Sequence, residues 1–393
     1  MRSCIAVLVI VISTIGSARA QDVSFYGFIK AESIHDTRQV AQVREGQFHL
    51  YPLKSQDLNA DGHDDLKTSN FLFAAFQSRV GATAMSTDIV GGDVTGVVEA
   101  DFFGSSNADV SMLRLRHAYA RWLRGHNELL FGQYWSPLFT AKVYPGVVGF
   151  STGAPFQPFA RFPQLRYVRT QRGLSVLAAV SSQRDAFQEI GGRKMQHQSG
   201  LPAGHLHITL SRGAMYFGLG GTAKKILCYL DGPSFTARAV TVYSRWKNDR
   251  VSLTAKGVYG EDLADHLMTG GFVATLKGSV EPTRVSSLWL DMAGSKGELT
   301  AGLFGGYLRN LGTASTLDSA VEESFSRAGD LSSLWRISPR LTYQAQSVRL
   351  ALEVEVTSAR YSRGFNDHYA PRQNSKQDRI TNVRTLIAAY YLF

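Results

Sequence analysis

The sequence has only two cysteines among its 393 residues, Cys4 and Cys228. Cys4 falls in a segment that we expect to be removed, so Cys228 would remain alone. A single cysteine excludes an intrachain disulfide framework and a multi-cysteine metal site. Charged residues are also few, at 19%, whereas aromatic residues reach 11%, and this composition argues against extended disorder.

Long apolar runs are missing as well. The run Cys4–Ile12 follows a basic start and leads into a small-residue Ala-x-Ala ending, which predicts a secretory signal peptide, residues 1–20, cut before Gln21. Its removal takes away Arg2 and Arg19 and lowers the net charge from +10 to +8. Beyond it, no apolar run approaches the ~18 residues of a spanning helix. The exported domain, residues 21–393, is therefore either a soluble periplasmic or secreted protein or a closed β-barrel.

The pattern that is present is alternation of apolar and polar residues with a period of two, the period of a strand. It is clear in Val23–Ser33, Asp93–Phe103 and Val383–Phe393. About sixteen such segments of roughly ten residues follow one another, separated by turn-forming residues. The sequence predicts an all-β protein.

Three features favour a transmembrane barrel over a soluble sandwich. The connections alternate between short, as in Thr87–Gly92, and long, as in Asp36–Ser69, which is typical of the two ends of a membrane barrel. Aromatic residues gather near strand ends, as at Tyr134 and Trp135. The chain also stops on an aromatic residue, Phe393, within a strand. We therefore expect an antiparallel β-barrel of about sixteen strands.

We expect the last segment, Asn382–Phe393, to be a strand of the barrel wall and also a signal for barrel assembly. Arg384 would point inward, and the strand would close the barrel by pairing with the first strand near Phe25–Ala31, because an unpaired edge in lipid is costly. We expect Tyr391 and Phe393 to be read by the barrel-assembly machinery. The face expected to meet lipid comprises Val383, Ile387, Ala389, Tyr391 and Phe393.

Five blocks of the first half resemble trimeric outer-membrane porins, most closely the DcaP-type family. They are Phe25–Lys30, Gln77–Gly81, Glu99–Gly104, Leu113–Tyr119 and Leu130–Ser136. Beyond Arg172 only the strand rhythm and Phe393 match. The resemblance implies a sixteen-stranded homotrimer in the bacterial outer membrane, in contact with lipid and lipopolysaccharide, that admits small anionic solutes such as dicarboxylates. Some members carry an N-terminal coiled coil; the first strand here begins almost at Gln21, so trimer contacts would rest on the barrel wall.

Basic side chains are the candidate anion-binding groups, because an arginine fork binds carboxylates and phosphates in pairs of hydrogen bonds. Arg114 and Arg116 share one strand face. The alternative for each arginine is pairing with lumen acids such as Glu99 and Asp101, or contact with lipopolysaccharide at the rim. The full candidate set is Arg79, Arg114, Arg116, Arg161, Arg166 and Lys142.

The long segment Ala141–Pro163 contains four prolines and four phenylalanines. Proline cannot continue a sheet interior, and the segment is too apolar to extend into water. We expect it to fold into the barrel as a constriction, with Arg161 and Lys142 at the narrowest point. The alternative is packing against a neighbouring protomer.

A calcium site is suggested by Asp57, Asn59 and Asp61, which are followed by Gly62 and carry oxygen ligands at the first, third and fifth positions of a calcium loop. The twelfth position is Thr68 rather than glutamate. The alternative is a solvated turn of an external loop.

Enzyme signals are weak. Gly218–Ala223 matches a dinucleotide-binding glycine pattern but lies inside an alternating strand, and His205 and His207 have no partners that would complete a metal set. The basic charge is spread by alternation rather than gathered in a patch, which argues against nucleic acid. We expect a passive diffusion channel without cofactors. The alternatives are an outer-membrane barrel enzyme and a secreted β-sandwich adhesion protein with a calcium loop.

Overall fold

The computed structural model describes residues 22–183, 194–372 and 378–393. The predicted signal peptide, residues 1–20, lies outside the described residues. Within those residues, no helix combines the length and the apolar composition needed to cross a membrane. The helices are η2 (Asp65–Lys67), η3 (Asn107–Asp109), η4 (Pro137–Phe139), α2 (Lys194–Gln198) and η5 (Ala264–His266).

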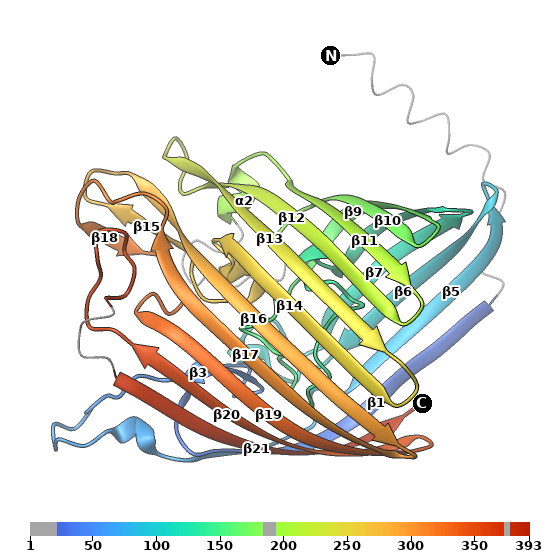
Figure 1. Ribbon diagram of the computed structural model, residues 1–393, viewed down its shortest axis with the longest axis horizontal. Helices are drawn as coiled ribbons and strands as arrows, with labels where there is room; N and C mark the ends of the chain where they lie inside the picture. Colours follow the sequence, from blue (N-terminus) through green and yellow to red (C-terminus); the bar gives the residue numbers. More distant parts are fainter. Residues whose placement is uncertain (1–21, 184–193, 373–377) are drawn as a thin grey trace.

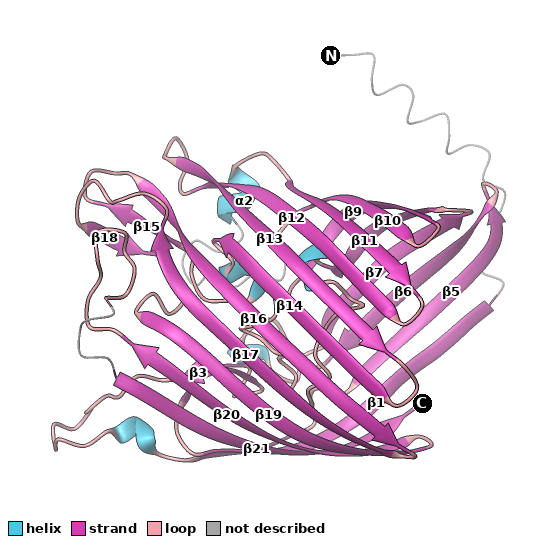
Figure 2. Cartoon of the chain, viewed as in Figure 1, coloured by secondary structure: helices cyan, strands magenta, loops and turns pink. Residues whose placement is uncertain are grey.

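Strands make up most of the rest, and loops join them (Figure 2). The wall strands are β1 (Asp22–Asp36), β4 (Asn70–Ala74), β5 (Arg79–Ile89), β6 (Gly92–Asp101), β7 (Arg114–Arg124), β8 (Asn127–Trp135), β9 (Arg161–Gln171), β10 (Leu174–Ser181), β11 (Ala203–Arg212), β12 (Met215–Leu227), β13 (Ser234–Lys247), β14 (Val251–Glu261), β16 (Val280–Lys296), β17 (Leu299–Thr313), β19 (Leu331–Ala345), β20 (Val348–Tyr361) and β21 (Asp378–Leu392).

The wall strands close into a single antiparallel ring (Figure 1). Each pairs with its neighbours in chain order, and β4 and β5 both pair with β1, so they are two parts of one interrupted strand. Counted in this way, sixteen strands form the wall in the described part of the chain. The predicted barrel is confirmed, and the two-sheet sandwich is wrong, because a sandwich has open sheet edges.

The ring closes at a seam between β1 and β21. Their register runs from Phe28 opposite Leu392 to Asp36 opposite Arg384. Phe393 continues the ladder, because it exchanges two backbone hydrogen bonds with Gly27, of 3.0 and 3.2 Å. The predicted pairing of first and last strands is confirmed, although it lies further along β1 than Phe25–Ala31.

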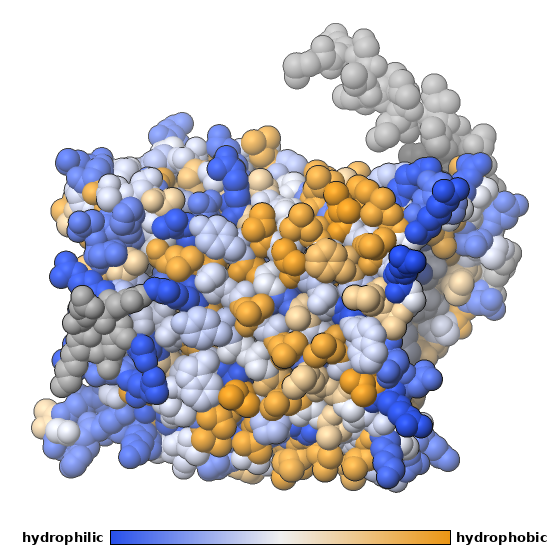
Figure 3. Space-filling model, in the orientation of Figure 1, coloured by the Kyte–Doolittle hydropathy of each residue, from blue (hydrophilic) through white to orange (hydrophobic). Residues whose placement is uncertain are grey.

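The outer surface of the ring is apolar, as the alternation predicts. Ile387 of β21 and Phe393, which follows it, are 58% and 54% exposed, whereas Arg384 of β21 points inward and is 1% exposed. Figure 3 shows hydrophobic residues over the middle of the visible wall and hydrophilic residues gathered at both ends. An apolar belt around a ring without free backbone edges is the arrangement that a lipid bilayer requires.

Short turns join the strands at one end of the ring, and long segments join them at the other (Figure 1). Two small strands, β15 (Phe272–Thr275) and β18 (Val321–Ser324), extend the sheet at the long-loop end. Three long segments at this end are the hairpin loop (37–69), the inner loop (136–160) and the η5 loop (262–279).

The hairpin loop was predicted to be external, but part of it lies inside the barrel. Its strands β2 (Val40–Val43) and β3 (Phe48–Pro52) pair with each other, and every residue of β3 is buried. Arg336 on β19 donates a 2.8 Å hydrogen bond to the His49 carbonyl. The Phe48 ring meets Phe150 of the inner loop at 4.7 Å between ring centres. The apolar run around Phe48 therefore has a place to be buried, which an external loop would not offer.

Candidate channel interior

The inner loop crosses the barrel, which confirms the predicted inward fold. The backbone N–H groups of Val148 and Gly149 both donate to the Glu353 carboxylate of β20, the latter at 2.9 Å. Further along, the Trp289 ring on β16 donates to Gln157 at 3.0 Å. The loop is thus held by hydrogen bonds to the wall opposite its own strands.

Local sequence explains where the inner loop starts. Ser136 follows the end of β8 and caps η4, and Pro137 occupies the first position of η4, where its missing N–H costs nothing. Thr140 then adopts a left-handed conformation (φ 54°) that stops the helix. Lys256 on β14, fully buried, donates to the carbonyls of Leu138 and Phe139 at the end of η4.

The end of the inner loop differs from the prediction. Arg161 and Pro163 belong to strand β9 rather than to the loop. Pro163 is tolerated because it lies where the ladder with β10 ends, and there its carbonyl accepts a hydrogen bond from Ser182. Arg161 is only 1% exposed, with its guanidinium 4.9 Å from the Trp135 ring and 5.5 Å from the Phe159 ring. It is therefore not at the open part of the interior.

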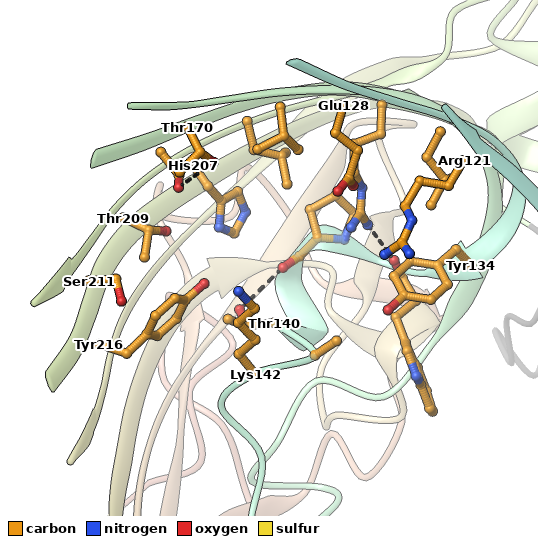
Figure 4. Close-up of a pocket in the computed structure, with 18 of the residues that line it drawn as sticks. Arg121, Glu128, Tyr134, Thr140, Lys142, Thr170, His207, Thr209, Ser211 and Tyr216 are labelled. Atoms are coloured by element: carbon orange, nitrogen blue, oxygen red, sulfur yellow. Dashed lines mark hydrogen bonds between the residues drawn. The ribbon is translucent and has the colours of Figure 1, made fainter. Parts of the chain in front are cut away.

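A first cavity of about 500 Å³ lies between the inner loop and strands β7 to β13. In Figure 4, Thr140 and Lys142 rise from the inner loop, with Tyr216 on one side and Arg121 on the other. Arg121, Lys142 and Arg166 supply its positive charge, and Glu128 supplies the one carboxylate among its described lining residues. We call it cavity 1.

Two of the three cations that line cavity 1, Lys142 and Arg166, lie over aromatic rings. Lys142 is exposed, and its ammonium lies 5.5 Å from the Tyr216 ring centre. The Arg166 guanidinium lies 5.1 Å from the Tyr134 ring and donates to the Trp135 carbonyl at 2.7 Å. Because rings attract cations without neutralising them, the positive charge stays available to a solute.

A second cavity of about 520 Å³ lies next to the first, since Tyr134, Trp135 and Ala141 line both. We call it cavity 2. Its charged lining within the described chain comprises Arg79, Arg116, Arg349 and Glu99. The Arg79 Nε atom lies 3.5 Å from Glu99, and its guanidinium lies over Phe28 at 5.0 Å.

Arg114 and Arg116 follow the alternative interpretation, pairing with lumen acids. Arg114 donates to Asp101 through Nε at 3.0 Å and Nη2 at 2.8 Å. Arg116 bridges Glu99 at 2.7 Å and Asp101 at 2.8 Å. Asp101 is fully buried. The charges of this pair are thus balanced within the wall, unlike that of Lys142.

Arg121 and Arg349, which line the two cavities, were not predicted from the sequence. Arg121 escaped because β7 contains a bulge: the register with β6 shifts where Glu99 faces His117 and Ala100 faces Leu115. Arg116 and His117, consecutive in the chain, are both buried on the inner side. A bulge reverses the in-and-out order of every residue after it, and so it turns Arg121 into the lumen. Arg349 lies at the start of β20, where turn and strand are hard to separate in the sequence.

The predicted calcium loop is exposed, and its carboxylates accept backbone hydrogen bonds. Asp57 accepts from Gly62 at 2.8 Å, and Asn59 accepts from Asp61 at 3.1 Å. In the described parts of the chain, no group of three His, Cys, Asp or Glu side chains is arranged to hold a metal. Calcium binding by Asp57, Asn59 and Asp61 stays a prediction.

Comparison with known proteins places the fold. No family model and no curated protein sequence matches the chain. Among solved structures it is similar to the outer membrane channel DcaP of Acinetobacter baumannii, with a TM-score of 0.71 and 19% identity over 95% of this chain and 97% of that one. It is also similar to an anion-selective porin from Comamonas acidovorans (TM-score 0.59, 10% identity, 95% and 99% covered). OmpT, an outer membrane protein of Vibrio cholerae, gives 0.56 and 12% identity over 96% and 100%. The protein therefore has the fold of the sixteen-stranded porins, and within that fold it is similar to DcaP.

Proposed function

We propose that the protein is a porin of the bacterial outer membrane: a passive diffusion channel that prefers small anionic solutes, carboxylates among them, and works as a homotrimer without a cofactor. The observation that carries the proposal is the charge of the two cavities. In each, three cations and one carboxylate line the wall among the described residues. Fixed positive charge in a narrow pore raises the local concentration of anions and repels cations.

The cations do not contribute equally. Arg114 and Arg116 share two carboxylates, so their field is largely cancelled nearby. Lys142 and Arg121 are exposed and line cavity 1. These two residues are therefore the ones on which we expect selectivity to depend most.

Reversal potentials in planar bilayers under a salt gradient test the proposal. We expect the purified protein to give the sign of an anion-selective channel. The double variant Arg121→Gln and Lys142→Gln should move the potential toward zero, and about 1 M salt should weaken the preference because the screening length falls to about 3 Å. The control is Arg363→Gln, a cation whose side chain is 60% exposed on a long loop; it should leave the potential unchanged. A cation-selective parent channel would overturn the proposal.

A further inference from the structure

A line of four buried polar side chains connects the barrel wall with the inner loop. Lys224 on β12 donates to Asp265 at 2.8 Å, and the other oxygen of Asp265 lies 2.7 Å from His266 Nδ1. His266 Nε2 lies 2.9 Å from the Ser136 hydroxyl. Asp265 and His266 belong to the η5 loop, and Ser136 is the first residue of the inner loop. We call these four residues the polar chain.

His266 holds the far end of the inner loop as well. Its backbone carbonyl accepts a 2.8 Å hydrogen bond from the N–H of Phe159. The two ends of the inner loop also meet directly, because Ser136 N–H donates to the Ala160 carbonyl at 2.9 Å. One residue of the η5 loop therefore contacts both points at which the inner loop leaves the wall.

The η5 loop is itself firmly placed. Leu263, Leu267 and Met268 are buried in the same apolar cluster as the phenylalanines of the inner loop. Burial alone would raise the pKa of Asp265, but His266 and Lys224 beside it lower that pKa well below the usual range of an aspartate. The carboxylate therefore stays ionised at neutral pH and keeps its pairing with Lys224.

Serine, histidine and aspartate in this order also form the triad of serine hydrolases. Two observations argue against catalysis here. Ser136 and His266 are 1% and 3% exposed, so the hydroxyl, which is bonded to His266, offers almost no surface to an ester carbonyl even though Ser136 borders cavity 1. The residue after Ser136 is Pro137, which has no N–H to stabilise an oxyanion. The arrangement therefore suits a structural link that holds the inner loop better than a catalytic nucleophile.

The anchored residues border the route that a solute would take. Ser136, Pro137, Thr140 and Lys142 all line cavity 1. A displacement at the start of the inner loop therefore moves the wall of cavity 1 and the ammonium of Lys142 with it. Removing a buried hydrogen-bond partner raises the population of the released arrangement by about tenfold or more.

We propose that His266 is a positioning residue for permeation, which clamps both ends of the inner loop and so fixes the width and charge of cavity 1. The inference rests on the proposed channel function. His266, which belongs to the η5 loop and not to the inner loop, would then determine how steady the channel current is.

Single-channel recording tests the role of His266. We expect His266→Ala to give assembled barrels whose current fluctuates among several levels, with a reversal potential shifted toward zero. His266→Gln should restore the steady parent current, because its amide can donate to Asp265 and accept from Ser136. Ser136→Ala, which removes a single oxygen, should make the current fluctuate in the same way but less. This second variant keeps the inference testable if His266→Ala does not assemble. The matched control is Thr241→Val, which removes a buried hydrogen bond from β13 to the Gly257 carbonyl without touching the polar chain; it should leave the current steady.

The outcomes separate this inference from the proposed function. A parent protein that does not conduct overturns the channel itself. A conducting parent with equally steady currents in His266→Ala and Ser136→Ala overturns the inference alone, as does a disturbed current in His266→Gln equal to that in His266→Ala. Labelling of Ser136 by a fluorophosphonate would also overturn it, because the hydroxyl would then be a reactive nucleophile.

Discussion

Basic residues of the barrel interior fall into two groups that differ in their surroundings. Arg114 and Arg116 are hydrogen-bonded to carboxylates and buried, so they connect neighbouring strands. Lys142 is exposed beside a tyrosine ring. Basic residues of one lumen therefore have two roles: some stabilise the wall, and others carry the charge that a passing solute meets. A substitution should reveal the difference through stability in the first case and through selectivity in the second.

Arg116→Ala should destabilise the barrel. It leaves the buried Glu99 and Asp101 with less compensating charge, and removing one member of a buried ion pair costs about 3–5 kcal/mol. The expected result is a lower temperature for the gel-mobility shift that accompanies barrel unfolding. Lys142→Ala is the control, since an exposed substitution of this kind changes stability by about 0.5 kcal/mol or less. Equal transition temperatures for the two variants would show that the ion pairs do not stabilise the wall.

At the scale of single strands, alternation predicts which side chains face lipid but not where the alternation slips. β21 follows it throughout, so Arg384 and Phe393 point as predicted. β7 does not, because the bulge at Arg116 and His117 turns two consecutive residues inward. No local residue type marks the bulge. It becomes visible only when β7 is paired with β6, and this is why the prediction missed Arg121.

Phe393 should be required for closure of the seam. Deleting it removes the two backbone hydrogen bonds to Gly27 and leaves polar groups without partners in hydrocarbon. We expect several-fold less assembled protein in the outer membrane, measured by heat-modifiable mobility of membrane fractions. Phe131→Ala is the matched control, because Phe131 is similarly exposed, at 58%, but lies on β8 away from the seam. Normal assembly after deletion of Phe393 would show that the seam closes without it.

For the whole molecule, the sequence predicted the ring, the approximate number of strands and the inward fold of the inner loop. It did not predict that the hairpin loop and the η5 loop also enter the barrel. Alternation predicts one buried and one exposed face for each strand, whereas every residue of β3 is buried, so its position inside the barrel cannot be predicted from that pattern. The contacts of the η5 loop with Lys224 and Ser136 join residues far apart in the chain. Such contacts follow from the closed ring rather than from any local pattern.

The proposed trimer should use the outer wall next to the seam. Phe71 and Phe73 on β4, which pairs with β1, are 65% and 70% exposed, and such large exposed rings side by side on one strand are typical of an interface. We expect Phe71→Ser with Phe73→Ser to convert trimers into monomers in native mass spectrometry from detergent. The control is Val240→Ser with Val242→Ser, two exposed positions on β13. If both double variants remain trimeric, another face forms the contact.

The position of the seam has a consequence for how the protein is made. The strand at the start of the described chain and the strand at its end are the two that meet, so the ring stays open until the whole length between them is in place. The hairpin loop, the inner loop and the η5 loop share one apolar cluster with wall strands from the later half of the chain, so their packing needs those strands as well. We therefore expect the interior to reach its final packing only when the first and last strands have met, so that wall and contents are completed together.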